Sequence, residues 1–242
     1  MIWSESGAMG SLWTQRNSTI KEDLMYAILV TGIPAAGKST MAGFLAEKLK
    51  LPVISKDSIK ELLFDSVGFR SREEKVKLGV ASMHLMYDTA GRLMQAGQPF
   101  ILENNFEYSS EQGLRDLLTK YPYSILTITL TGDYKVIYQR FLTRNASPDR
   151  HPGHVVNDCY PLKTQSDSKE KKEPSVSFED FVHGIEKRGF DKFTVGGDQI
   201  QGDHIQHIQI DTTDFSNVDM ETLYLQIAAW REKVLRQSAV KI

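Results

Sequence analysis

Short, continuous apolar runs recur along the chain and predict the strands of a buried parallel sheet. The runs are bounded by Gly, Pro or polar residues and are too short for buried helices. Strands that are covered on both faces have this uninterrupted apolar pattern. Five strands are expected, at Tyr26–Thr31, Pro52–Ser55, Phe100–Glu103, Ser124–Thr131 and Ile205–Ile210.

Segments with apolar residues three or four positions apart separate these strands and predict helices. Strands that alternate with helices form a parallel sheet with helices on both faces. The expected fold class is therefore α/β, with three layers and a sheet of about five strands. The helices are expected at Lys38–Leu49, Lys56–Phe64, Arg72–Ala96, Ser109–Lys120, Asp133–Asn145 and Asp219–Val240.

The length of 242 residues allows one ordinary α/β domain with some additional loop. Residues 1–24 are expected to be an N-terminal extension or leader outside the fold, and residues 25–242 a single domain. The stretch near 158–177 is rich in Lys, Ser, Glu and Asp and poor in large apolar residues. That composition predicts a mobile insert within the domain instead of a boundary between two domains.

Composition narrows the class of protein further. A net charge of -2, with 25% charged and 40% hydrophobic residues, is typical of a soluble globular protein and gives no sign of a nucleic-acid coat. No stretch approaches the ~20 apolar residues that span a bilayer, so no membrane association is expected. The single cysteine, Cys159, excludes an internal disulfide and favours a reducing compartment, the cytoplasm.

A complete Walker A motif, G-I-P-A-A-G-K-S, lies between the first predicted strand and the first predicted helix. Its glycines let successive backbone N–H groups point at phosphate oxygens, and the helix adds its positive end. ATP and Mg²⁺ are therefore the expected cofactors, with Lys38 at the β- and γ-phosphates and Ser39 on the metal. The predicted nucleotide-binding residues here are Gly32, Ile33, Pro34, Ala35, Ala36, Gly37, Lys38, Ser39 and Thr40.

Asp57 follows the second predicted strand and is a candidate catalytic residue. The carboxyl ends of parallel strands face one crevice, so this carboxylate should lie near the phosphate-binding loop. There it could accept the proton of an attacking hydroxyl group. The alternative is that Asp57 only caps the next helix, with Ser58 and Glu61 forming a capping box.

Glu103 ends the third predicted strand and is followed by Asn104 and Asn105. A carboxylate directly after an apolar strand suits a Walker B role, in which it holds Mg²⁺, usually through water. The alternative is a turn at the strand end, for which an Asn-Asn pair is equally suited. The metal-binding candidates are therefore Ser39 and Glu103.

Three arginines suggest a lid near residues 140–155. Arg140 and Arg144 lie four residues apart on one predicted helix face and should project together, and Arg150 follows them. Arginines beside a flexible loop suit a lid that neutralises charge on a transferring phosphoryl group. The alternative is an ordinary solvated helix face.

Together these residues resemble a P-loop kinase group that includes polynucleotide 5′-hydroxyl kinases, zeta-toxin-like kinases and chloramphenicol phosphotransferases. They are most similar to bacterial proteins often labelled AAA-type ATPases or predicted kinases. The resemblance covers residues 25–145, the segment Arg150-His-Pro-Gly-His154 and the segment Ile210-Asp-Thr-Thr-Asp214. It implies the three-layer P-loop NTPase fold.

The resemblance also implies roles for particular residues. Asp57 corresponds to the general base, and Glu103 replaces an Asp with a side chain one carbon longer. Arg140 and Arg144 correspond to lid arginines, with Arg150 as an additional phosphate-binding candidate. Thr212 and Thr213 lie in the loop that contacts adenine in these kinases, and Lys60 stands where polynucleotide kinases have an acceptor-binding Arg.

The expected function is an ATP- and Mg²⁺-dependent phosphotransferase that moves the γ-phosphate to a hydroxyl group. The expected partners are a nucleotide and a small-molecule or nucleotide acceptor. The alternative is an ATPase or nucleotide-gated binding module without an acceptor. The motifs contain no specificity code for the acceptor and indicate neither an oligomeric state nor a protein partner.

Overall fold

The sheet has five parallel strands in the order β2-β3-β1-β4-β5, as expected from the apolar runs. The structure, a computed structural model, describes residues 25–161, 176–193, 195 and 205–240. Predicted and observed strand ends differ by one residue at most. The strands are β1 (Tyr26–Gly32), β2 (Val53–Ser55), β3 (Phe100–Glu103), β4 (Ser124–Thr131) and β5 (Ile205–Asp211).

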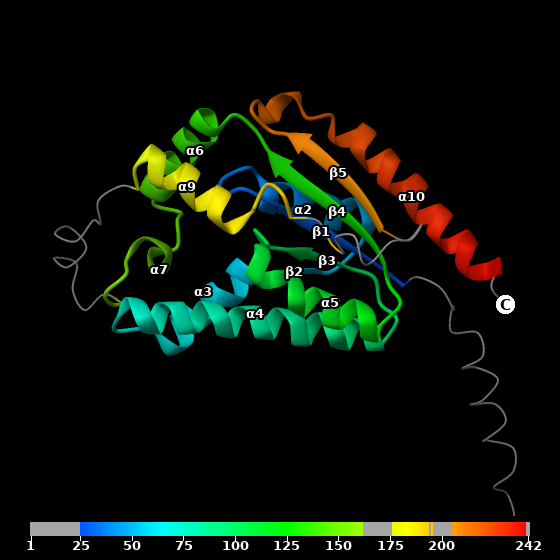
Figure 1. Ribbon diagram of the computed structural model, residues 1–242, viewed down its shortest axis with the longest axis horizontal. Helices are drawn as coiled ribbons and strands as arrows, with labels where there is room; N and C mark the ends of the chain where they lie inside the picture. Colours follow the sequence, from blue (N-terminus) through cyan, green and yellow to red (C-terminus); the bar gives the residue numbers. More distant parts are fainter. Residues whose placement is uncertain (1–24, 162–175, 194, 196–204, 241–242) are drawn as a thin grey trace, which may run out of the picture.

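Helices cover both faces of this sheet, which confirms the three-layer fold (Figure 1). The predicted segment Ser109–Lys120 begins as a 3₁₀ turn, Tyr108–Ser110, before the α-helix starts. A second 3₁₀ turn, Phe215–Asn217, follows β5. The α-helices are α2 (Lys38–Leu49), α3 (Lys56–Val67), α4 (Arg72–Gln95), α5 (Glu111–Lys120), α6 (Tyr134–Ala146), α7 (Pro152–Val155), α9 (Phe178–Arg188) and α10 (Met220–Val240).

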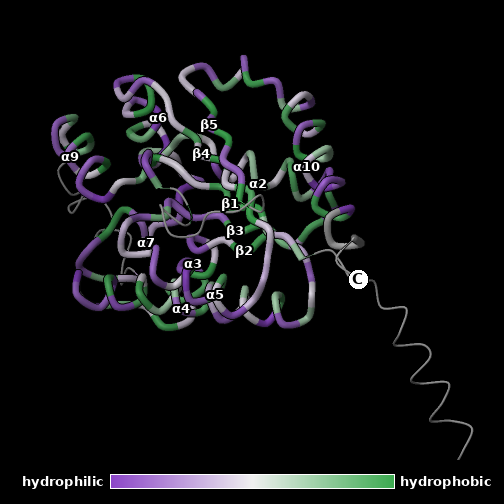
Figure 2. Tube along the Cα trace, turned by 45° about the vertical axis from the view of Figure 1, so that its right-hand side comes forward, coloured by the Kyte–Doolittle hydropathy of each residue, from purple (hydrophilic) through white to green (hydrophobic). Residues whose placement is uncertain are grey.

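Two hydrophobic clusters lie on opposite faces of the sheet, and β1 contributes alternate residues to each. Ile28 and Val30 belong to the cluster under α2, α6, α9 and α10. Ala27 and Leu29 belong to the cluster under α4 and α5. This is the two-residue period of a strand buried on both sides. In Figure 2 hydrophobic residues gather in the strands at the centre, around β1 and β3.

Helix α9 was not expected from the sequence. It begins after Ser177, whose hydroxyl accepts a hydrogen bond from Asp180 N, and it ends at Gly189 in the left-handed region. Phe181 packs against the aromatic rings of α6. The Ser cap, acidic first turn and terminal Gly are recognisable helix signals, but they follow directly on the polar insert. The expected extension at 1–24 and most of the insert lie outside the described residues.

The register brings the ends of three strands together. Ser55 of β2 and Val30 of β1 both pair with Glu103 of β3. Because the strands are parallel, their carboxyl ends and the loops that follow lie along one edge of the sheet. Within the described part of the chain, no helix is long and apolar enough to cross a membrane.

Candidate active site

The phosphate loop, residues 32–39, has a backbone that side chains would obstruct. Gly32 and Gly37 have φ angles of 125° and 94°. A Cβ atom at Gly32 would lie 1.9 Å from the carbonyl oxygen of Leu130, and one at Gly37 would lie 2.4 Å from the ring of Phe215. Ala35 also holds a positive φ of 67°. Alternation of such conformations turns backbone N–H groups toward a common centre.

Two N–H groups of the loop are used internally, which corrects part of the prediction. Ile33 N donates to Leu130 O at 3.2 Å, and Ala36 N donates to Ile33 O at 3.3 Å. These two amides hold the loop against β4 and fix its turn. Pro34 has no N–H group to donate. Three of the nine predicted residues therefore shape the loop without offering a free amide.

The first turn of α2 provides the amides that suit a phosphate group. Lys38, Ser39 and Thr40 are its first three residues, so they have no earlier carbonyl of the helix to bind. The first regular helical bond runs from Met41 N to Gly37 O at 3.0 Å. Free N–H groups and the positive end of the helix dipole together favour an anion at this position.

Lys38 is buried at the base of the loop, with 8% of its surface exposed. Its Nζ donates to Ile33 O at 2.9 Å. Burial lowers the pKa of Lys38 to about 8, while the charges of Glu103 and Asp57 act to raise it. A partly desolvated ammonium group of this kind gains strongly from the charge of a phosphate.

Glu103 is buried beside Lys38 and accepts two hydroxyl hydrogen bonds. Ser39 Oγ donates to Oε1 at 3.2 Å, and Ser55 Oγ donates to Oε2 at 2.5 Å. Carboxylate and serine oxygens are suitable ligands for Mg²⁺, either directly or through water. The two predicted metal-binding residues, Ser39 and Glu103, are therefore in contact, and their donor set fits a hard cation.

Asp57 does not cap α3, so that alternative is wrong. The helix begins at Lys56, and the N-cap is Ser55, whose hydroxyl accepts from Ser58 N at 3.4 Å. Asp57 is the second residue of the helix and no hydrogen bond holds its side chain among the described residues. The helix begins two residues earlier than a cap at Asp57 would require. Its carboxylate is therefore free to bind another molecule.

The surroundings of Asp57 favour the charged carboxylate. Its side chain is accessible to solvent, although protein surrounds it closely on its other sides. Burial acts to raise its pKa, but the positive charges around it, those of Lys56, Lys60 and Lys38 among them, outweigh burial, and the pKa is lowered. The deprotonated carboxylate therefore has the buried Lys38 of the phosphate loop among its neighbours.

Arg144 and Arg150 bring two guanidinium groups into the same region. The Nε atoms of both are buried and meet no hydrogen-bond acceptor among the described residues. Burial lowers the pKa of Arg144, whereas Asp57 and Glu103 are close enough to raise it. Burial likewise lowers the pKa of Arg150, with Asp57 acting in the opposite direction. Buried donors without acceptors are costly, and an anion would satisfy them.

Arg140 takes a different position, which contradicts the prediction that it projects with Arg144. Its guanidinium group donates to the carbonyl oxygens of Thr212 and Thr213, at 2.5 and 2.6 Å. The loop after β5 therefore lies against α6, and its carbonyl groups bind the Arg140 side chain. Arg140 therefore holds this loop in place and does not point toward the phosphate loop.

Thr212 is fully buried, and its hydroxyl donates to Thr131 O at 2.8 Å. This side chain therefore pins the loop to the sheet and presents no surface to a nucleotide, contrary to the expected direct contact. Thr213 Oγ1 accepts from Asp133 N at 2.7 Å and so ties the same loop to the start of α6. The loop lies beside Gly132, where a Cβ atom would meet Thr213 N at 2.9 Å.

The structure adds Lys56, which the sequence did not indicate as a site residue, and places it near Lys60, the position at which polynucleotide kinases have an acceptor-binding Arg. Lys56 and Lys60 lie one turn apart on α3, on either side of Asp57. Burial lowers the pKa of both lysines, and Asp57 acts to raise both. Lys60 Nζ lies 5.3 Å from the ring centre of Phe64. Their spacing around Asp57 was the available signal, because residues four apart share a helix face.

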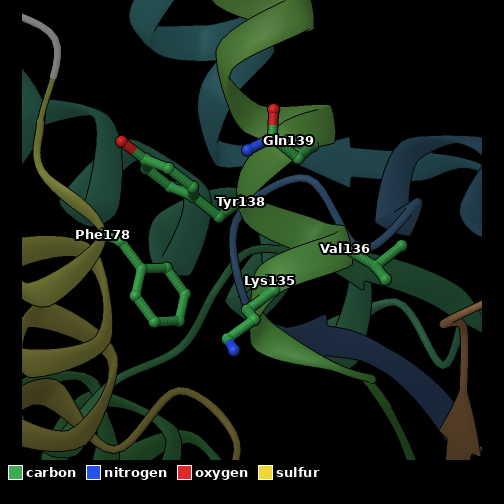
Figure 3. Close-up of a pocket in the computed structure, with 5 residues that line it drawn as sticks. All are labelled: Lys135, Val136, Tyr138, Gln139 and Phe178. Carbon is green, nitrogen blue, oxygen red and sulfur yellow. The ribbon is translucent and has the colours of Figure 1, made fainter.

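A separate pocket of about 360 Å³ lies between α6 and α9 (Figure 3). Tyr138 and Phe178 contact each other there, with ring centres 5.5 Å apart. None of the residues that line this pocket belongs to the phosphate loop or to the charged groups around Asp57. They are Lys135, Val136, Tyr138, Gln139 and Phe178.

A known structure shares this fold. A crystal structure described as a "putative kinase" from Chloroflexus aurantiacus is 28% identical to this chain, with a TM-score of 0.67, and the similarity covers 85% of this chain and 98% of that one. A gluconokinase from Sinorhizobium meliloti is 12% identical, covering 91% and 99% of the two chains, and a shikimate kinase from Bacteroides thetaiotaomicron is 15% identical, covering 86% and 98%. Both have TM-scores of 0.46, too low to carry an argument about this chain.

The family comparison agrees with the geometry. No curated protein matches the chain. Residues 28–159, more than half of the chain, match the AAA domain family AAA_33. The matched region contains the phosphate loop, Asp57, Glu103 and all three predicted arginines. The chain therefore belongs to the AAA domain family AAA_33 and has the fold of the P-loop kinase group.

Proposed function

We propose that this protein is an ATP- and Mg²⁺-dependent phosphotransferase that moves the γ-phosphate to a hydroxyl group. One observation carries the proposal. The carboxylate of Asp57 is free and charged, and it lies beside Lys38 and two arginines whose buried Nε atoms have no acceptor among the described residues. A site with a base and unsatisfied cations suits an incoming hydroxyl and an anionic phosphoryl group.

The phosphate loop and α2 would bind the nucleotide. Amides of the first helical turn would donate to phosphate oxygens, and Lys38 would leave Ile33 O for the β- and γ-phosphates. Ser39 and Glu103 would hold Mg²⁺, which neutralises phosphate charge when bound. The contact between their oxygens supports this assignment.

In the transfer step, Asp57 takes the proton of the acceptor hydroxyl. The acceptor oxygen forms a bond to the γ-phosphorus, the bond from that phosphorus to the β–γ bridging oxygen breaks, and ADP leaves. Arg144 and Arg150 would donate to the phosphoryl oxygens as their charge is redistributed. Positioning and charge neutralisation supply most of the catalysis in this chemistry.

The acceptor side of the site is basic, which favours an acceptor that carries a negative group beside its hydroxyl. Arg188 Nε donates to Glu107 Oε2 at 2.5 Å, so these two charges compensate each other. On α3, Lys56 and Lys60 lie on either side of Asp57 and Glu61 follows Lys60, while the charge of Glu107 also acts on Lys56. An anionic group on the acceptor would balance the excess positive charge.

Phosphoryl transfer from γ-labelled ATP with Mg²⁺ tests the proposal. The acceptors are a 5′-hydroxyl oligonucleotide and a cell extract of small molecules, divided by anion exchange into anionic and neutral fractions. A labelled product from the wild type and none from Asp57→Asn is expected, with the anionic fraction as the best source of acceptor. Asp116→Asn, an exposed change on α5, should retain the activity.

Free phosphate released equally by the wild type and Asp57→Asn would contradict the kinase proposal. That result would favour the alternative, an ATPase or nucleotide-gated module without an acceptor. Product formed only from the neutral fraction would contradict the preference for an anionic acceptor while leaving the transferase intact.

A further inference from the structure

Residues 150–160, here called the strap, cross the hairpin formed by α3 and α4. The end of the strap is joined to the turn between these helices by a two-residue antiparallel bridge. Phe69 N donates to Tyr160 O and Tyr160 N donates to Phe69 O, both at 2.8 Å. The strap includes the last part of the predicted lid, residues 150–155, and the bridge beyond it attaches the strap to α3 and α4.

The middle of the strap packs on Phe64 of α3. The rings of His151 and His154 lie 5.9 and 5.8 Å from the Phe64 ring, measured between ring centres. Between them, Gly153 approaches so closely that a Cβ atom there would lie 2.4 Å from Phe64 Cδ2. This contact requires a glycine and fixes the depth at which α7 lies.

Two histidines of the strap also bind acidic residues of α3. His154 Nε2 lies 2.8 Å from Glu61 Oε1, and His151 Nε2 lies 3.1 Å from Asp65 Oδ1. Gly153 N donates to His151 Nδ1, which leaves Nε2 of that ring as the donor to Asp65. The strap and the helix that bears Asp57 are therefore linked at two points.

Lys75 of α4 supplies the most concentrated attachment of the strap. It is buried, with 9% of its surface exposed. Its Nζ donates to His154 O at 3.0 Å, to Val156 O at 2.5 Å and to Asn157 Oδ1 at 2.8 Å. These charge-assisted hydrogen bonds hold the strap firmly. Removing the ammonium group would leave the carbonyl groups of the strap without this donor, which is costly for buried acceptors.

We propose that Lys75 is a positioning residue. Its hydrogen bonds to the backbone at the end of α7 hold Arg150 beside Asp57. Arg150 directly precedes the N-cap of this helix, His151. The four-residue helix is too short to fix its own direction, so its attachments at 154–157 set where Arg150 lies. The inference rests on the proposed function, because it assigns Arg150 to the γ-phosphoryl group.

The test compares the affinities of the full chain for MgADP and for the magnesium complex of the non-hydrolysable ATP analogue AMP-PNP, measured by calorimetry. Arg150→Ala should weaken AMP-PNP binding roughly tenfold, the effect of losing one charge-assisted hydrogen bond, and leave MgADP binding unchanged. Lys75→Met should reproduce this selective loss. The double variant should be no weaker than either single one, because both changes remove the same contact.

Matched variants separate positioning from general damage. Lys77→Met lies on the same helix, where Lys77 is exposed and pairs with Glu73, and should behave as the wild type. Lys75→Arg retains the charge and the donors and should restore part of the preference for AMP-PNP. Should Lys75→Met fail to fold, Asn157→Ala removes one acceptor of the lysine and should give a smaller change in the same direction.

Amide hydrogen exchange tests the attachment without nucleotide. Val156 N donates to Pro152 O at 3.2 Å within α7. A peptide covering 151–157 should exchange about tenfold faster in Lys75→Met than in Lys77→Met, because its local opening becomes easier. Equal exchange in the two variants would overturn the attachment.

The two proposals fail in different ways. A wild type that binds neither nucleotide, or an Arg150→Ala variant with unchanged preference, would contradict the proposed function. A Lys75→Met variant that keeps the wild-type preference while Arg150→Ala loses it would overturn the positioning role alone.

Discussion

Ser55 and Glu103 are joined by a hydrogen bond of 2.5 Å from the serine hydroxyl to the carboxylate, across the adjacent strands β2 and β3. The same hydroxyl accepts from Ser58 N and caps α3. One side chain therefore fixes the candidate metal-binding carboxylate and the start of the helix that bears Asp57.

Ser55→Ala should lower the free energy of unfolding by about 2 kcal/mol, because the helix loses its cap and a buried carboxylate loses a donor. It should also raise the Mg²⁺ concentration needed for half-maximal phosphoryl transfer. Urea unfolding and a Mg²⁺ titration measure the two effects. Ser58→Ala is the control, since its exposed side chain makes neither contact. An equal loss of stability in both variants would contradict the dual role.

Lys38→Met should abolish nucleotide binding yet stabilise the nucleotide-free protein at neutral pH. The folded-state pKa of Lys38 is lowered to about 8 because burial penalises its charge. Below pH 8 the lysine is charged in both states, and folding bears this cost, which is at most about 3 kcal/mol. Above pH 8 the folded state releases the proton first, so the stability of the wild type rises relative to the variant.

Urea unfolding without nucleotide at pH 7 and at about pH 10 measures this effect. The advantage of Lys38→Met should shrink at the higher pH. Lys233→Met, an exposed change on α10, should show no such dependence. A wild type that is more stable than Lys38→Met at pH 7 would show that the hydrogen bond to Ile33 O outweighs the burial of charge.

Arg140→Met should mainly reduce stability, whereas Arg144→Met should mainly reduce kcat. Arg140 holds the carbonyl groups of Thr212 and Thr213, so its loss should reduce stability by about 1–3 kcal/mol. Arg144 has a buried Nε without an acceptor among the described residues, so its loss should cost little stability and lower kcat by about 100-fold or more. Thermal unfolding and turnover number separate the two. A larger fall in kcat for Arg140→Met would reverse the assignment.

His154 should make the protein sensitive to mild acid. Burial lowers its pKa to about 3, whereas the unfolded chain takes up this proton near pH 6.5. Between these values the unfolded state binds more protons, so the free energy of unfolding falls as the pH drops from 6.5. We expect His154 to account for about 2 kcal/mol of this fall by pH 4.5.

His154→Gln should reduce the fall while retaining Glu61, whose pKa is raised by burial and which therefore acts in the opposite direction. Urea unfolding of both proteins at pH 7 and at pH 4.5 provides the comparison. His84→Gln, on α4, is the control for a histidine outside the strap. Parallel pH dependence of the wild type and His154→Gln would contradict a neutral, buried His154.

Local sequence patterns predicted the sheet closely and the strap poorly. Apart from Gly32 and Ser124 at their ends, β1 and β4 consist of apolar or β-branched residues, so burial on both faces could be recognised from the residues alone. Helices α7 and α9 are short or follow a polar insert, and contacts with Phe64 and with α6 hold them in place. Such contacts between residues far apart in the chain leave little local signal.

The residues of the candidate site likewise fall into those that the sequence grouped correctly and those that it did not. Lys38, Asp57 and Glu103 could be brought together from the sequence, because each ends or follows a predicted parallel strand and the carboxyl ends of such strands lie along one edge. Arg140 and Arg144 have the same residue type and a helical spacing that groups them. Their different partners depend on where the loop after β5 contacts α6. The spacing of the two arginines in the sequence gives no information about that contact.

The sequence by itself determined the order of the elements, the sheet and the phosphate loop, because period, apolar runs and glycine positions act over a few residues. Only the tertiary structure decided which polar groups satisfy one another. Arg140 is bound by two carbonyls, Arg144 is left without an acceptor among the described residues, and Lys75 holds the strap. Hydrogen bonds of this kind depend on ångström-scale distances between distant segments, and packing alone sets those distances.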